Sequence, residues 1–318
     1  MKDAKETTKY PGIREAMDGN TAVIMCEREA SDAAGAYPIT PSTQMGEYWA
    51  EAAAAGHINI SDRPLIFIEP EGEHAAAAVT AGLSMVGLRS CNFSSGQGIA
   101  YMHESLYAAV GKRLTYILNM GCRAITKSTL NVHAGHDDYH AVDDTGFFQV
   151  FGKNVQEVAD LNIISHKIAE LALNPGIVAQ DGFLTTHLIE SLLLPERKLI
   201  EEYLGHPDDI IDTPTPAQRI IYGDKRRRIP LLWDVDNPVM AGIVLLKSAG
   251  MAKYMNENVA GVHVPDTFIK RMADAPKEKR SAESIAIAAE LIGAMRGLCR
   301  GVHIMPIGWE RHLPRVLD

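Results

Sequence analysis

Four short segments of this sequence carry side chains suited to chemistry, and each comes at the end of an expected strand. The first presents the hydroxyl of Thr40 between Pro38 and Pro41. Proline fixes its own φ angle and keeps the preceding residue out of the helical region, so we expect a stiff turn. Sites on open α/β sheets are commonly built on such rigid loops. Taken alone, the segment is explained equally well as a simple Pro-containing connector.

The second segment is acidic, with carboxylates at Glu69, Glu71 and Glu73. Alternating carboxylates could hold a metal ion. A solvated loop, or a helix N-terminus that attracts acidic side chains through its dipole, explains them more simply. Glu73 differs from the other two because an Ala-rich, closely packing helix follows it. Its carboxylate is therefore expected to be partly buried, and a buried carboxylate must find a donor or take up a proton.

The third segment is the turn Ser94–Ser95–Gly96–Gln97–Gly98. Glycines and hydroxyls at a strand-to-helix turn can bring backbone N–H groups close to an anion. The segment does not have the glycine and lysine spacing of a phosphate-binding P-loop. A tight entry into a helix explains it as well as a ligand-binding loop does.

The fourth segment begins with Arg123, again just after an expected strand. The planar fork of an arginine suits a substrate carboxylate. The residues after it include potential metal ligands, namely His133, His136, Asp137, Asp138 and His140. They lie in a Gly-containing loop without the i, i+4 spacing of a helical metal site, so we favour a loop that faces the active site over a metal centre.

Strands and helices in alternation join these segments. We expect strands at 65–68, 89–93, 115–119 and 177–180, and helices at 43–55, 73–87, 99–112 and 162–173. Over residues 1–190 this alternation predicts an α/β fold, a doubly wound, mostly parallel sheet with helices on both faces. Ligands of such sheets bind beyond the carboxyl ends of the strands, where the four segments lie.

The pattern changes after residue 190. Residues 191–237, a charged helix at 192–205 and then a stretch rich in Pro, Asp and Arg, are predicted to be an extended linker or interface segment. The basic run at 225–228 is expected to be a solvated loop or a site of ion pairs between subunits. Residues 238–318 are predicted to form a small βα lobe with only two strands. Two strands cannot bury both faces of a parallel sheet, so the lobe needs another surface.

Composition limits the classes of function. The 318 residues carry a net charge of −9, which argues against a nucleic-acid partner. The cysteines contain no Cys-x-x-Cys pair, which excludes an iron–sulfur ligand set within this chain and fits a reducing, cytoplasmic compartment. Neither a signal peptide nor a membrane span is expected. The four cysteines are Cys26, Cys91, Cys122 and Cys299.

Several motifs in one order resemble the 2-oxoacid:ferredoxin oxidoreductases, most closely the first domain of pyruvate:ferredoxin (flavodoxin) oxidoreductase. The resemblance runs from about Asp18 to Val244. The motifs that carry it are Asp18–Gly19–Asn20–Thr21, Tyr37–Pro38–Ile39–Thr40–Pro41–Ser42, Glu73 at its helix, Arg123–Ala124, Gly135–His136–Asp137, Thr145–Gly146–Phe147 and Asp181–Gly182–Phe183.

This resemblance implies the oxidative decarboxylation of a 2-oxoacid, with pyruvate as the first candidate, to an acyl-CoA on thiamine diphosphate. This chain would cover the aminopyrimidine side of the cofactor, with Glu73 bonded to the pyrimidine ring nitrogen. Thr40 and Arg123 match residues that hold the carbonyl and carboxylate of the substrate. These three are the implied catalytic residues; Ser95, Gly96 and Gln97 are implied to line the cofactor. Gly96 stands where the pyruvate enzymes have a serine, which leaves the substrate open.

Two further features of that family are missing. The sequence has no Gly-Asp-Gly with a downstream Asn to bind magnesium and the diphosphate, and no cysteines for a cluster. The resemblance therefore implies half of an active site, inactive alone and without a metal of its own. Partner chains in an oligomer would supply the magnesium–diphosphate domain and the iron–sulfur clusters. Through them electrons would reach ferredoxin or flavodoxin.

The end of the chain, 238–318, resembles a different family. Residues 241–243, 248–256, 261–266 and 301–305 are similar to the last strands and helices of methylenetetrahydrofolate reductase, a flavin-binding (β/α)8 barrel. The earlier barrel strands, which supply most flavin contacts, are missing, so flavin is not expected and the segment is expected to contribute packing only. The alternatives are a methylenetetrahydrofolate reductase-like flavoprotein and a non-catalytic chimeric or truncated chain.

Overall fold

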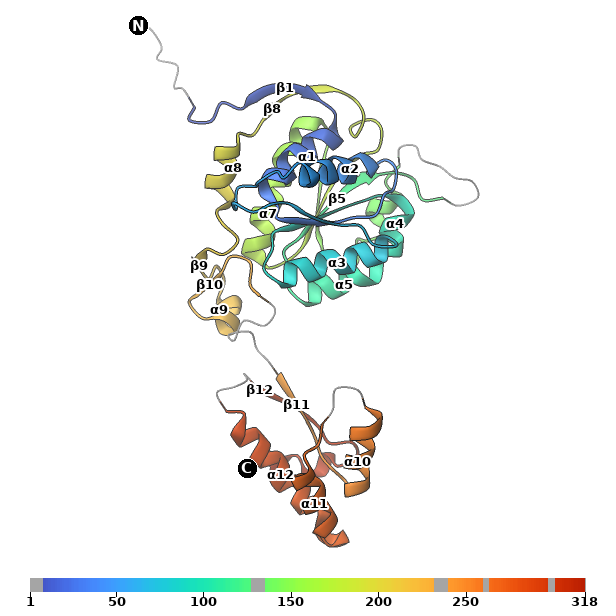
Figure 1. Cartoon of the computed structure of the whole chain (residues 1–318), viewed down its shortest axis with the longest axis vertical. Coiled ribbons are helices and arrows are strands. Elements are labelled where there is room, and N and C mark those ends of the chain that lie inside the picture. Colours follow the sequence, from blue (N-terminus) through green and yellow to red (C-terminus); the bar gives the residue numbers. More distant parts are fainter. Residues whose placement is uncertain (1–7, 127–134, 232–239, 260–262, 297–300, 318) are drawn as a thin grey trace. The chain divides into compact units, whose positions relative to one another are not determined.

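The structure is a computed structural model that describes residues 8–126, 135–231, 240–259, 263–296 and 301–317 (Figure 1). The chain divides into two compact units, Met1–Asp234 and Val235–Asp318, each of which is described by itself. Among the helices of the described ranges, none has the length and apolar character that a membrane crossing requires. The predicted boundaries at 190 and 237 stay predictions.

The first unit is built on a six-stranded parallel sheet with the strand order β3-β2-β4-β5-β7-β6. Every residue of its strands β2, β4 and β5 is buried, as parallel strands covered on both faces should be. The predicted α/β class is confirmed. The strands are β2 (Ala33–Gly35), β3 (Ile66–Ile68), β4 (Ser90–Ser94), β5 (Ile117–Cys122), β6 (Phe148–Gly152) and β7 (Gly176–Asp181).

Helices cover both faces of this sheet (Figure 1). Successive strand residues point to opposite faces, so Phe93 packs with the first set of helices and Leu118 with the second. The first set is α1 (Gly19–Ala30), α2 (Thr43–Ala54) and α7 (Val155–Ala172). The second set is α3 (Glu73–Met85), α4 (Gly96–Tyr101) and α5 (His103–Gly111), and the short α6 (Asp137–His140) contacts α4.

Three predicted helices differ from the structure. The one expected at 162–173 is α7, which already begins at Val155. The helix expected at 99–112 is two helices, α4 and α5, which meet at Met102. The first part of the helix expected at 192–205 is a strand, β8 (Glu190–Leu194), and only α8 (Arg197–Leu204) is helical. β8 pairs antiparallel with β1 (Ile13–Met17). Its leucines alternate between buried and exposed positions, a period of two that favours a strand.

The basic run after α8 is folded into the first unit. Strands β9 (Ile210–Asp212) and β10 (Lys225–Arg227) form an antiparallel pair around α9 (Pro216–Tyr222). Arg226 is only 4% exposed, and its Nη2 donates to the backbone carbonyl of Glu170 at 2.7 Å. The expectation of a solvated loop or an inter-subunit site is therefore wrong for Arg226, because its guanidinium binds carbonyls of its own chain.

The second unit contains a two-stranded parallel sheet. Strands β11 (Met240–Val244) and β12 (Gly301–Met305) pair in register, which confirms the predicted pairing. Ile243 packs with Ile285 of the longest helix, so one face of the sheet is covered. The helices are α10 (Ala249–Asn258), α11 (Asp266–Asp274), α12 (Arg280–Ala294) and α13 (Pro314–Leu317), with 3-10 turns at Lys277–Lys279 and Glu310–His312.

Candidate functional site

The loops that carry the predicted site residues leave the sheet at one edge. Thr40 follows β2, Glu73 follows β3, Gly96 follows β4 and Arg123 comes directly after β5. These four strands are parallel neighbours, so their carboxyl ends lie side by side. The prediction that Thr40, Glu73 and Arg123 come together at one edge of a single sheet is confirmed.

Arg123 lies at the centre of this edge. Its Nη1 donates to the backbone carbonyl of Thr40 at 2.7 Å, and its Nη2 donates to Oε1 of Gln97. The residue is 5% exposed, and its buried Nε has no hydrogen-bond partner within the described ranges. Burial lowers the pKa of the Arg123 guanidinium, and the charges of Asp138 and Glu73 oppose that shift. A buried, unused N–H suits a further acceptor such as a carboxylate.

Gly96 makes room for the Arg123 side chain. Its φ is +51°, in the left-handed region that favours glycine. A Cβ at this position would fall directly against Nε of Arg123. The absence of a side chain at position 96 therefore decides where the guanidinium lies.

A fully buried carboxylate, Asp138, joins two of these loops. Its Oδ2 accepts from the backbone N–H of Gly96 at 2.7 Å and from that of Arg123 at 2.9 Å. The Gly96 N–H thus bonds an internal carboxylate, which favours a tight helix entry over an anion-binding turn. The sequence analysis assigned Asp138 to an active-site loop and gave it no role. The only local hint of its importance is that it directly follows the Gly135–His136–Asp137 motif.

Glu73 begins α3 and is half-buried, as expected. Helix α4 passes so close that a Cβ on Gly98 would lie 2.7 Å from Cγ and 2.8 Å from Oε1 of Glu73. Glycine at 98 therefore lets the two helices approach around the carboxylate. Glu69 and Glu71 are exposed, which agrees with a solvated loop.

Ser42 ties the Thr40 turn to the neighbouring strands β4 and β5 through hydrogen bonds. The Ser42 hydroxyl donates to the carbonyl of Ser94 at 2.8 Å and accepts from the N–H of Gly121 at 3.0 Å. Thr40 itself is exposed, and its carbonyl, not its hydroxyl, contacts Arg123. Ser42 belongs to the site and was not predicted, although it ends the proline motif.

The other predicted cofactor residues bond within the chain. Ser95 is fully buried and its hydroxyl contacts that of Ser42. Gln97 bonds Arg123 through its oxygen and donates its Nε2 to the hydroxyl of Thr126. The roles of all six predicted site residues stay predictions.

A polar pair lies at the carboxyl end of β7, where Nε2 of His136 is 3.0 Å from Oδ2 of Asp181. His140 instead bonds Asp143, at 3.1 Å, and His133 lies outside the described residues. Within the ranges the structure describes, no group of three or more His, Cys, Asp and Glu could hold a metal ion. The expectation of an active-site loop in place of a metal centre remains the simpler one.

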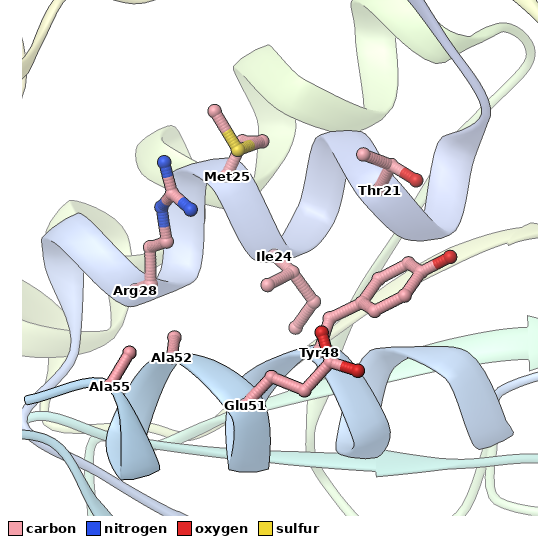
Figure 2. Close-up of a pocket in the computed structure, with 8 residues that line it drawn as sticks. All are labelled: Thr21, Ile24, Met25, Arg28, Tyr48, Glu51, Ala52 and Ala55. Atoms are coloured by element: carbon pink, nitrogen blue, oxygen red, sulfur yellow. The ribbon is translucent and has the colours of Figure 1, made fainter. Parts of the chain in front are cut away.

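A separate groove of about 400 Å³ lies between α1 and α2 (Figure 2). None of the predicted site residues lines it. Its lining residues are Thr21, Ile24, Met25 and Arg28 from α1, and Tyr48, Glu51, Ala52 and Ala55 from α2 and its C-terminal end.

Comparison with known proteins identifies the family of this chain. Residues 26–253 match the family described as pyruvate flavodoxin/ferredoxin oxidoreductase, thiamine diphosphate-binding. Pyruvate synthase subunit PorA of Pyrococcus furiosus is 33% identical over 214 residues, 66% of this chain and 52% of PorA. The pyruvate-flavodoxin oxidoreductase of Klebsiella pneumoniae is 32% identical over 196 residues, 62% of this chain and 17% of that protein. The chain thus spans about half the length of PorA.

A solved structure shows the same fold. The 2-oxoglutarate:ferredoxin oxidoreductase of Magnetococcus marinus, solved with 2-oxoglutarate, coenzyme A and succinyl-CoA, superposes with a TM-score of 0.52. It is 15% identical, and the match covers 96% of this chain and 66% of that one. None of these matches supports the expected methylenetetrahydrofolate reductase segment. The family match covers well over half of the sequence, so this chain belongs to the thiamine diphosphate-binding family of the pyruvate flavodoxin/ferredoxin oxidoreductases.

Proposed function

We propose that this chain is a subunit or fragment of a 2-oxoacid:ferredoxin or flavodoxin oxidoreductase, with pyruvate as the first substrate to test. It would supply the pyrimidine side of a thiamine diphosphate site. One observation carries the proposal: a nearly buried arginine with an unused N–H and a half-buried glutamate, whose charge acts on that arginine, both lie at the carboxyl edge of a parallel sheet. The arginine is Arg123 and the glutamate is Glu73.

The residues of this edge fit the cofactor. Glu73 offers a carboxylate at a helix N-terminus, backed by Gly98, that would hold a proton on a ring nitrogen. Bound thiamine diphosphate supplies the electron sink for decarboxylation of a 2-oxoacid. Arg123 would bind the substrate carboxylate through N–H groups that Thr40 and Gln97 do not use. Because Arg123 is only 5% exposed, Gln97 or the Thr40 turn has to shift for a carboxylate to reach it.

Partner chains complete this proposal. The described cysteines, Cys26, Cys91 and Cys122, are buried and free, and burial raises the pKa of each thiol. Buried thiols that resist ionisation are poor ligands for an iron–sulfur cluster. The clusters, the magnesium ion and the diphosphate-binding residues would therefore come from other subunits. Electrons would leave through them to ferredoxin or flavodoxin.

The test uses the chain assembled with its partner subunits. We expect thiamine diphosphate with Mg²⁺ to bind and pyruvate to be oxidised in the presence of coenzyme A. Glu73→Gln should slow deuterium exchange at C2 of the thiazolium ring far more than it weakens cofactor binding, because an amide keeps the shape but not the charge. Exchange at the wild-type rate would remove Glu73 from this role. Absence of thiamine diphosphate binding in the assembled complex would overturn the proposal.

Arg123→Lys separates substrate binding from cofactor binding. A lysine ammonium is a point charge that cannot form two parallel bonds to a carboxylate. We expect the KM for the 2-oxoacid to rise while the Kd for thiamine diphosphate stays unchanged. An unchanged KM would show that Arg123 does not bind the substrate.

A further inference from the structure

Asp138 is a carboxylate of the sheet edge whose recorded hydrogen bonds all lie within the protein. The residue is fully buried in the short helix α6. Its Oδ2 accepts from the N–H groups of Gly96 and Arg123, and its Oδ1 accepts from the N–H of Tyr139 at 2.9 Å. One side chain thus connects the start of α4, the end of β5 and its own helix.

We propose that Asp138 is a positioning residue that fixes the substrate-binding arginine, Arg123, relative to the turn at Gly96. This inference rests on the proposed function. Three backbone donors converge on the carboxylate, and an ionised carboxylate is the side chain that accepts all three without offering a donor. The contact holds the β4–α4 turn and the β5 end at a fixed separation.

The separation matters because the Arg123 side chain lies over Gly96 with no space for even a methyl group between them. Gln97, the next residue of the turn, bonds the Arg123 guanidinium. A shift of the turn by a few tenths of an ångström therefore moves both the surface under Arg123 and a hydrogen-bond partner of its guanidinium. The position of the guanidinium depends on Asp138 although the two side chains share no hydrogen bond.

The energetics of Asp138 agree with a positioning role. Burial raises the pKa of its carboxyl group, and the N–H groups of Arg123, Gly96 and Tyr139 offset this only in part. The carboxylate therefore stays buried at a net cost in stability. Costly buried charges of this kind cluster at functional sites, where geometry counts for more than stability.

The first test is Asp138→Ala in the assembled complex. Alanine has neither acceptor oxygen, so the N–H groups of Gly96, Arg123 and Tyr139 all lose this partner. We expect the KM for pyruvate to rise about tenfold or more, as for loss of one buried hydrogen bond, with thiamine diphosphate affinity within about twofold of wild type. Asp143→Ala is the matched control, because Asp143 is an exposed carboxylate nearby that bonds only His140 among the described contacts.

A second measurement needs no variant. In the wild-type chain the amides of Gly96 and Arg123 should exchange with solvent as slowly as those inside β4 and β5, and in Asp138→Ala both should exchange at least about tenfold faster. Fast exchange of both amides in the wild type would show that Asp138 does not hold the β4–α4 turn to the end of β5, whatever the activity of the enzyme. A wild-type KM in Asp138→Ala, with active enzyme, would overturn the positioning role and leave the proposed function standing. Failure of the wild-type complex to bind thiamine diphosphate would overturn the proposed function. Slow exchange of the two amides would still support the contact of Asp138 with the β4–α4 turn and the end of β5.

Discussion

The two units of this chain differ in where they place a group of interacting charged side chains: one is buried in the first unit, and one is exposed in the second. In the first unit Glu27 and His166 are both fully buried, 3.0 Å apart, between α1 and α7. In the second unit Arg271 bonds Glu283 at 2.7 Å and Glu290 at 2.6 Å, and all three side chains are 31–57% exposed.

The difference follows from the number of strands. A six-stranded parallel sheet with helices on both faces encloses an interior thick enough for a polar network. There Glu27 accepts from four side chains, which are Ser31, Asn119, Asn162 and His166. The two-stranded sheet of the second unit leaves strand residues half-exposed. It also leaves a groove of about 450 Å³ beside Gly242 and Met305. Charge burial is possible only where enough layers surround it.

The largest expected effect on stability comes from removing the Glu27 carboxylate from the buried network. Glu27→Ala leaves the donors around it unpaired and should lower the free energy of unfolding of the first unit by about 3–5 kcal/mol. Chemical denaturation followed by separate probes in the two units measures this. Glu27→Gln, which keeps an acceptor oxygen, should cost less. Equal losses for both variants would show that volume, not polarity, matters at this position.

The next effect is local to the sheet edge. Gly96→Ala forces a Cβ into the left-handed region, at about 1–2 kcal/mol, and against the Arg123 side chain. We expect kcat/KM for the 2-oxoacid in the assembled complex to fall at least about tenfold, because the guanidinium is displaced. Gly46→Ala is the control, since Gly46 lies within α2 with open space around its Cα. That variant should be neutral or gain up to about 1 kcal/mol. Similar activity losses in both variants would contradict the role of Gly96.

Lowering the pH should change the difference in the free energy of unfolding between wild type and Glu27→Gln, and this effect should be smaller. Burial raises the pKa of the Glu27 carboxyl, but the charge and hydrogen bond of His166, with Ser31 and Asn119, outweigh it and hold the pKa below its ordinary value. A lowered pKa stabilises the fold above the ordinary glutamate value of about 4.3, and that contribution is lost as the pH falls through the folded pKa. The stability difference between wild type and Glu27→Gln should therefore shrink below about pH 4. A constant difference would show that folding does not lower the Glu27 pKa, and a difference that grows as the pH falls would show that folding raises it.

The smallest effect is expected in the second unit. Arg271→Gln breaks two exposed ion pairs and should change the free energy of unfolding of that unit by no more than about 0.5 kcal/mol, less at high salt. A loss as large as that of Glu27→Ala would end the contrast between the units.

Much of the sheet edge could be predicted from local sequence. The strands expected at 65–68, 89–93 and 177–180 lie within one or two residues of β3, β4 and β7, because buried apolar runs bounded by turns are local signals. Glu73 was predicted at the start of its helix and lies there. The order of strands in a βα alternation then brings Glu73 and Arg123 to one edge.

The contacts of that edge could not be predicted in the same way. Asp138 reaches Gly96 and Arg123 only after the chain has folded, and nothing in its local pattern separates it from Asp137. Arg226 was expected to be solvated because it lies in a basic run. In the structure its guanidinium donates a hydrogen bond to a backbone carbonyl of α7.

The alternation of strands and helices, the loops that follow the strands and the family can all be read from the amino-acid sequence, because periodicity and motifs are properties of neighbouring residues. Which polar groups are buried, and which partners satisfy them, depends on how the elements pack together. Asn119 of β5 and Asn162 of α7 meet Glu27 of α1 from distant parts of the chain. A buried polar group must be paired, but its partner can come from any element that packs against it, and no local pattern states which one does.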